Sequence, residues 1–159
     1  MKKSTWIIAL LMFSCMATAQ DSVTIAKILP YAEGVGSAAV RTECDWNTQF
    51  STFLAEFAKS GVTVSSTDIE QAQGKVLFMT VTHVHTAGGG AYSGPKWATI
   101  RGELRDGANV IGSFYANRTT STGSLSACSA LNRVGKAIAK DISIWLKAPS
   151  IDAKLGNAR

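Results

Sequence analysis

The feature that most constrains this fold is a run of three segments with alternating apolar residues in the second half of the chain. They span 75–86, 97–105 and 110–118, and Asp106-Gly107-Ala108-Asn109 forms a tight turn between the last two. An apolar residue at every second position is typical of a strand with one buried face. The pattern therefore predicts three consecutive antiparallel strands.

The same alternation constrains the hairpin between the last two strands. The residues expected to share one face are Ala98, Ile100, Gly102 and Leu104 in one strand and Val110, Gly112, Phe114 and Ala116 in the other. A two-residue turn would place these two sets on opposite faces of the sheet. We therefore expect a connection with an odd number of residues, or a bulge.

Two amphipathic helices are expected on either side of these strands. The first follows Asp45, whose carboxylate we expect to accept amide hydrogens of the first turn, and it ends at Gly61. The second spans 128–147, is capped by Ser126 and is stopped by Pro149. Helical spacing defines their apolar stripes, which are Trp46, Phe50, Phe53, Leu54 and Phe57, and then Leu131, Val134, Ile138, Ile142 and Trp145.

Shorter elements complete the order of the chain. A first strand is expected over 23–31, a loop over 32–41, a short strand over 62–65 and a helical turn over 67–73. This order predicts an α/β (α+β) two-layer sandwich: about five mainly antiparallel strands with two long helices on one face. One domain over 20–148 would hold it, followed by a loose tail over 149–159.

The first 19 residues have the three parts of an export signal. Lys2 and Lys3 precede an apolar run over 6–16, and Ala17-Thr18-Ala19 is a small-residue cleavage pattern. The run is too short to span a bilayer, which takes about 20 residues. Met12-Phe13-Ser14 is a poor lead-in to a lipid-bearing Cys15. We therefore expect a periplasmic protein, not a lipoprotein, with no transmembrane segment in the mature chain.

Charge and cysteine content narrow the class further. Without Lys2 and Lys3, 14 of the 16 basic residues remain against 11 acidic ones, a net charge of +3. This mild, scattered excess does not indicate nucleic acid as a partner. Cys44 and Cys128 would be left as a pair in an exported chain, which most often forms a disulfide. Neither lies in a Cys-x-x-Cys motif, so we expect the disulfide to be structural rather than redox-active.

The run GKVLFMTVTHVHTAGGGAYSGPKWATIRGELRDGANVIGSFYANRTT, continued by ACSALNRVGKAIAKDISIWL, resembles small bacterial envelope proteins of unknown function. Their fold is similar to the amino-terminal domain of TolB and to CsgG and LpoB. Those families share a hairpin with a glycine-rich tip, a second hairpin with a polar turn, and a closing amphipathic helix. The resemblance covers about residues 23 to 147 and includes no diagnostic catalytic motif. It implies an envelope-associated accessory protein that is not an enzyme.

His83 and His85 are the sharpest candidates for chemistry. Two residues apart on a strand, they leave the same face and could form half of a zinc or copper site. The chain has no other histidine, so a third ligand would have to be Glu33, Glu43 or Asp45. The alternative is that both imidazoles are ordinary strand residues bonded to their neighbours.

Two surfaces are candidates for binding. The first is the rim at the His85 end, where the topology gathers two helix N-termini, the disulfide and the glycine-rich tip with Tyr92. Helix N-termini offer free amide hydrogens, so this rim could hold an anion. The second is the sheet face away from the helices, where aromatic and basic side chains make a partner or dimer surface. The residues expected there are Phe78, Trp97, Arg101, Ile111 and Tyr115.

These observations predict an exported, non-catalytic envelope accessory protein that acts by protein or ligand binding. We expect no cofactor, and an envelope protein or cell-wall component as the partner; the oligomeric state is left open. A periplasmic metal-binding protein using the His-x-His strand is the alternative. An uncharacterised hydrolase is the third hypothesis, because no histidine is paired with a clear nucleophile.

Overall fold

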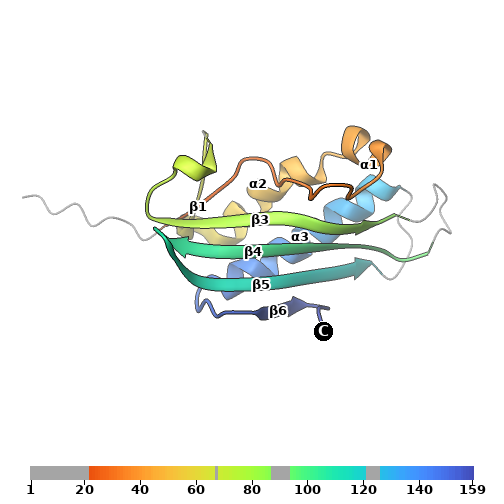
Figure 1. Ribbon diagram of the computed structural model, residues 1–159. Helices are drawn as coiled ribbons and strands as arrows, with labels where there is room; N and C mark the ends of the chain where they lie inside the picture. The colour runs from red at the N-terminus through yellow and green to blue at the C-terminus, as the bar shows by residue number, and fades with distance from the viewer. Residues whose placement is uncertain (1–21, 67, 87–93, 121–125) are drawn as a thin grey trace, which may run out of the picture.

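The computed structural model describes residues 22–66, 68–86, 94–120 and 126–159, which form a two-layer sandwich. One sheet of six strands, in the order β2-β1-β3-β4-β5-β6, forms the front layer in Figure 1, and the two long helices cover its back. The predicted fold class is confirmed. The elements are β1 (Val23–Ile25), α1 (Ala38–Glu43), α2 (Trp46–Ala58), η1 (Lys59–Gly61), β2 (Val62–Val64), η2 (Ile69–Gln71), β3 (Lys75–His85), β4 (Lys96–Asp106), β5 (Asn109–Thr120), α3 (Ala127–Trp145) and β6 (Ala153–Gly156).

The core lies between the sheet and the two long helices. Three residues of the predicted α2 stripe, Trp46, Phe50 and Leu54, are completely buried, while Phe53 and Phe57 are only partly buried. The sheet supplies residues from its three long strands, and α3 supplies its whole predicted stripe. The largest of these buried side chains are Leu77, Val81, Ile100, Leu104, Leu131, Val134, Ile138 and Ile142. Apolar burial on this scale is the main term that stabilises the fold.

The hairpin between β4 and β5 contains the predicted bulge. Leu104 pairs with Gly112 and Arg105 with Val110, so Ile111 is an extra residue on β5. The bulge lets Ala98, Ile100, Phe114 and Ala116 share the buried face. Two predicted positions are wrong because of this bulge. Val110 was expected on the buried face, but it lies opposite Arg105 and is exposed. Ile111 was expected on the uncovered face, but it lines a pocket with Leu104 and Leu146 beside the helices.

The predicted loose tail is wrong: residues 153–156 form β6, which pairs in parallel with β5. As the outer strand, β5 would otherwise leave its backbone groups unpaired, and β6 satisfies them. Asn157 N–H donates to Asn117 O at 2.7 Å and closes the strand. A bidentate pair between Arg118 and Asp141, with both contacts at 2.7 Å, joins β5 to α3 beside Gly156. The hydrogen bond to Asp141 raises the pKa of Arg118 above its ordinary value.

The segment before α2 also differs from the prediction. The first strand stops at Ile25, and the chain meets β3 again where Val81 N–H donates to Pro30 O at 2.8 Å. The expected loop contains α1, whose cap Ser37 accepts from Val40 N–H at 3.3 Å. These short elements have too few residues to show a clear period in the sequence.

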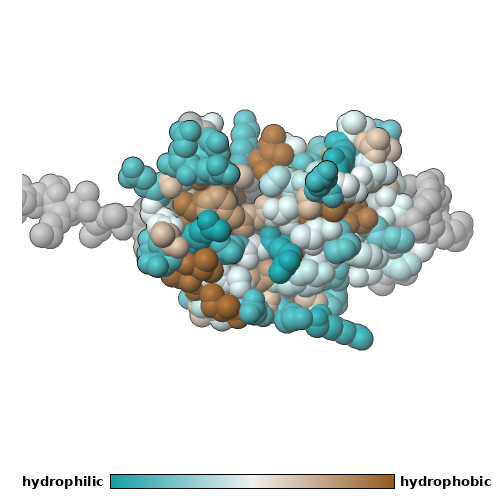
Figure 2. Space-filling model, in the orientation of Figure 1, coloured by the Kyte–Doolittle hydropathy of each residue, from teal (hydrophilic) through white to brown (hydrophobic). Residues whose placement is uncertain are grey.

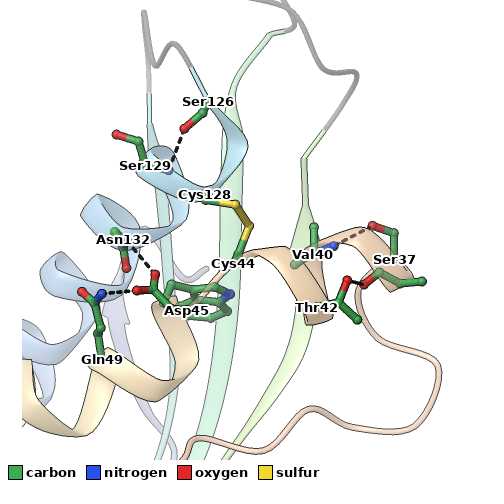
Figure 3. The surroundings of a disulfide bond; sticks show 12 residues. Ser37, Val40, Thr42, Cys44, Asp45, Gln49, Ser126, Cys128, Ser129 and Asn132 are labelled. Atoms are coloured by element: carbon green, nitrogen blue, oxygen red, sulfur yellow. Dashed lines mark hydrogen bonds between the residues drawn. A yellow bond between two sulfur atoms is a disulfide. The ribbon is translucent and has the colours of Figure 1, made fainter.

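The ends of the helices are partly as predicted. Ser126 caps α3 by accepting from Ser129 N–H at 3.1 Å, as expected. Asp45 does not cap α2 through its carboxylate. That carboxylate instead accepts from Gln49 of the same helix and from Asn132 of α3 (Figure 3). The left-handed residue at the end of α2 is Lys59, with φ of 56°, and not Gly61.

The predicted disulfide joins Cys44 to Cys128, with Cα atoms 4.9 Å apart. Cys44 lies two residues before the start of α2, and Cys128 lies in the first turn of α3 (Figure 3). The bond therefore fastens the starts of the two long helices to each other at one end of the sandwich.

Tyr31 holds the buried indole of Trp46, and its loss is expected to destabilise the protein. Trp46 Nε1–H donates to Tyr31 Oη at 2.7 Å, and Trp46 is completely buried. In Tyr31→Phe this donor loses its acceptor, so the free energy of unfolding should fall by about 2 kcal/mol. Chemical denaturation at neutral pH measures this. The control is Tyr115→Phe, a half-buried tyrosine whose hydroxyl has no partner among the described residues, and a shift no larger than that of the control would contradict the prediction.

Tyr31 also predicts a sensitivity to alkali. Burial raises the pKa of its phenol above the ordinary value of 10.0, so the fold favours the neutral form. The resulting stability is present below the unfolded pKa and is lost as pH rises through the higher folded pKa. The stability difference between wild type and Tyr31→Phe should therefore shrink above pH 10.

Candidate functional site: the open sheet face

One face of the sheet is covered by the helices. No helix of the described residues covers the other, which we call the open face (Figure 1). Predicted binding residues Trp97, Arg101 and Tyr115 all lie on it, on the central strands β4 and β5. Tyr92 lies outside the described residues. The residues that define the open face are Phe78, Thr80, His83 and His85 of β3, Trp97, Thr99, Arg101, Glu103 and Arg105 of β4, Ser113, Tyr115, Asn117 and Thr119 of β5, and Lys154 of β6.

A second bulge decides where the histidines lie. Val81 pairs with Ile100, but His83 already pairs with Thr99, so Thr82 is an extra residue in β3. Strict alternation would place His83 and His85 on the same face as Val81, inside the core. The bulge turns both onto the open face and brings Val84 opposite the buried Ala98 instead.

Both imidazoles lie against the indole of Trp97. His85 pairs directly with Trp97 across the strands, and their rings stack at 5.6 Å between centroids with 14° between planes. His83 approaches the same indole at 6.1 Å. Cross-strand aromatic pairs of this kind hold side chains in place on a sheet. Together the histidines fix Trp97, which stays partly exposed.

A small recess of about 350 Å³ lies between Trp97 and Tyr115. His83 forms part of its wall, and Thr99 and Asn117 lie at its base. Asn117 Nδ2 donates to Thr99 Oγ1 at 2.9 Å and to Ala98 O at 3.3 Å, which fixes the amide at this point. The recess thus combines aromatic walls with an ordered polar base.

A larger and shallower hollow of about 890 Å³ continues from Tyr115 toward the β4–β5 turn. Arg105 lies over the Phe78 ring at 5.1 Å and forms an ion pair with Glu103. Tyr115 lines both spaces, so the hollow and the recess adjoin on the open face, and we call the two together the depression. Of its charged side chains, four are basic and two acidic: Arg101, Arg105, Lys154 and Arg159 against Glu103 and Asp152.

Several polar groups in this depression have no hydrogen-bond partner among the residues that the structure describes. Within the described part of the chain, the side chains of Arg101, Trp97 and Tyr115 make no hydrogen bond or ion pair. Thr82 Oγ1 is buried there and also has no hydrogen-bond partner among the described residues. Buried polar atoms are usually satisfied, so an unsatisfied one in a hollow indicates a place where a ligand or water completes it.

Sequence reasoning missed the wall formed by the C-terminal residues. Asp152, Lys154 and Arg159 border the larger hollow, although they were assigned to a loose tail. Asp152 is held there by Ser113, whose Oγ accepts from Asp152 N–H at 2.8 Å and donates to Oδ1 at 3.2 Å. Four residues of alternation, Ala153 to Gly156, were the only signal in the sequence.

The groups predicted to share one rim lie in two different layers of the sandwich. The starts of α2 and α3 do lie at the His85 end, joined by the disulfide, but they belong to the helix layer (Figures 1 and 3). The histidines face away from that layer. Among the described residues no three His, Cys, Asp or Glu side chains form a metal-binding group, so Glu33, Glu43 and Asp45 do not complete the pair.

Comparison with solved structures shows a shared fold. The protein CT253 from Chlamydia trachomatis matches with a TM-score of 0.53 and 11% identity, over 80% of this chain and 99% of that one. The PelC dodecamer from Paraburkholderia phytofirmans matches with 0.50 and 20%, over 82% and 89%. A Helicobacter pylori protein, described as a homolog of a neuraminyllactose-binding hemagglutinin, matches with 0.52 and 11%, over 80% and 83%.

These neighbours are bacterial proteins, and their low identity limits the likeness to the fold. No family model matches the chain, and no curated protein matches it significantly. The resemblance to TolB, CsgG and LpoB stays a prediction. Among the described residues, no helix is both long and apolar enough to cross a membrane.

Proposed function

We propose that this is an exported envelope protein that acts by non-covalent binding through its open face. The observation that carries the proposal is the depression on that face, where the side chains of Trp97, Arg101 and Tyr115 make no hydrogen bond or ion pair with the described residues. A concave site with aromatic walls and a few convergent polar groups is the usual form of a binding site. An envelope protein or a cell-wall component is the partner we expect.

Several features support binding rather than catalysis or metal chemistry. The histidines stack on Trp97 and have no third ligand among the described residues. In the depression no histidine is hydrogen-bonded to a serine or threonine of the described chain, as a general base would be. The signal-like first 19 residues and the disulfide support export to an oxidising compartment.

Site-specific photo-crosslinking in growing cells tests the proposal. A photoreactive residue at Thr119 or Tyr115, which both line the recess, should give a discrete adduct with one envelope component, identified by mass spectrometry. The matched positions on the helix layer are Lys140 and Ile144, which are exposed and should give none. Adducts that form equally from both layers, or from neither, would contradict the proposal.

A homo-oligomer is the second arrangement to distinguish. One fold neighbour, PelC from Paraburkholderia phytofirmans, is described as a dodecamer. In a comparable assembly of this chain, the crosslinked partner would be a second copy. The mass of the adduct separates this result from capture of a different envelope component.

A further inference from the structure

We propose that the open face binds an acidic polysaccharide, a linear glycan bearing carboxylates, lying lengthwise along β4. This inference rests on the proposed function and specifies its ligand. It is carried by the length of the depression, the chemistry of its walls and its charge.

The length of the depression suits a chain molecule. Its β4 wall extends from Trp97 in the recess to Arg105 in the hollow, and Tyr115 lines both spaces. Eight residue-to-residue steps of about 3.3 Å each span about 26 Å. A compact metabolite would fill only a part of this distance, whereas several linked sugar rings would fill it.

The open face offers side chains and no free backbone. β4 is paired on both sides, with β3 and with β5, so its amide and carbonyl groups are already used. Extended peptides usually bind a sheet by adding to an edge strand through backbone hydrogen bonds. A ligand over the middle of this sheet must instead be recognised by rings and side-chain donors. That requirement favours a glycan over a peptide.

Aromatic rings with polar edges are the groups that sugar rings contact. A pyranose has an apolar C–H face that packs on an aromatic ring and hydroxyls at its edge that form hydrogen bonds. Trp97 and Tyr115 both line the recess, and each has an N–H or O–H without a partner in the described chain. Figure 2 shows the middle of the sheet as pale and teal, with brown groups gathered toward the β4–β5 turn. The face is therefore polar with aromatic inserts, unlike an apolar dimer interface.

The charge of the depression selects an acidic ligand. Arg105 already pairs with Glu103, and Asp152 accepts from Ser113. Arg101 lies between the recess and the turn end with no ion pair among the described residues. A guanidinium binds a carboxylate through two parallel hydrogen bonds, which gives both strength and orientation. Arg101 is therefore the residue we assign to a carboxylate of the glycan.

Calorimetric titration with polygalacturonate, a linear acidic glycan, tests the inference on the mature protein. Saturable binding is expected, and it should weaken at high salt because the charges are exposed. Trp97→Ala and Arg101→Gln should each weaken binding about tenfold, through loss of a ring contact and of a charge-assisted hydrogen bond. The matched control is Arg133→Gln, an exposed arginine on α3, which should bind as wild type does.

Tryptophan fluorescence gives an independent readout of where the glycan binds. Trp46 and Trp145 are buried, so Trp97 is the one partly exposed tryptophan of the described chain. Its emission should change on binding, and this change should be absent in Trp97→Phe. A change that persists in Trp97→Phe would place the glycan elsewhere and overturn the inference.

Matched polymers separate the alternatives. Fully methyl-esterified polygalacturonate keeps the sugar rings and removes the charge, and equal binding of it would overturn the assignment to an acidic ligand. Polyglutamate keeps the charge without sugar rings, and equal binding of it would overturn the assignment to a glycan.

If neither polysaccharide binds while open-face crosslinks still capture another envelope component, the inference fails and the proposed function stands. If the crosslinks capture only a second copy, the face is a self-association interface and the inference is overturned.

Discussion

Replacing Cys44 and Cys128 together with serine is expected to lower the free energy of unfolding by about 4 kcal/mol. The disulfide closes a loop with a sequence separation of 84 residues, and so restricts the unfolded chain over most of the domain. It also joins the helix starts, where Cys44 is buried. Urea denaturation of the mature protein, with wild type measured in parallel, gives the difference.

Reduction of the wild-type protein provides the control for this change. Dithiothreitol should lower the unfolding midpoint of wild type to that of the double variant, and should leave the variant unchanged. A loss below about 1 kcal/mol would show that the unfolded chain is already restricted without the bond. If the double variant does not fold, the same loss of stability can be measured by adding increasing amounts of reductant to the wild-type protein.

Replacing Gly102 with alanine is expected to cost about 3 kcal/mol, because the sheet has no room for a methyl group there. Gly102 pairs with Phe114 across the strands, and a Cβ atom would lie 2.3 Å from the Phe114 ring. That ring has little room to move, since it is buried and packs edge-to-face against Trp145 with 4.9 Å between ring centroids. Thermal and urea unfolding both measure the loss.

Two further variants show whether the clash is the cause. Gly61→Ala is the matched control, because a Cβ atom at Gly61 meets nothing within 4 Å, and its stability should change little. Adding Phe114→Leu to Gly102→Ala removes the ring edge that clashes. The double variant should lose less than the sum of the two single changes. A strictly additive result would refute the explanation.

The sequence predicted the layers of the fold well because the long elements carry a strong period. β3, β4, β5 and α3 each span at least eleven residues, so alternation or helical spacing is unambiguous in them. The bulge in the β4–β5 hairpin followed from the requirement that two apolar sets share one core. The last strand, β6, could not be predicted, because its four residues, Ala153–Gly156, show too little pattern to distinguish a strand from a tail.

The candidate site was predicted only in part. Trp97, Arg101 and Tyr115 alternate with buried residues, so their place on the uncovered face follows from the strand period. The histidines do not follow it, because nothing in the residues around Thr82 marks the bulge that turns them outward. The wall formed by Asp152, Lys154 and Arg159 depends on β6, and was missed with it.

The bulge at Thr82 also bears on how related chains should be compared. The side of the sheet on which the imidazoles lie depends on the number of residues between Val81 and the histidines, and not only on which residues these are. A relative with one residue fewer at this point could retain His83, His85 and Trp97 and still direct the imidazoles into its core. Aligned letters alone would then suggest a shared surface that the two molecules do not have. The number of residues between Val81 and His83 is therefore the criterion for recognising related proteins that have the same open face.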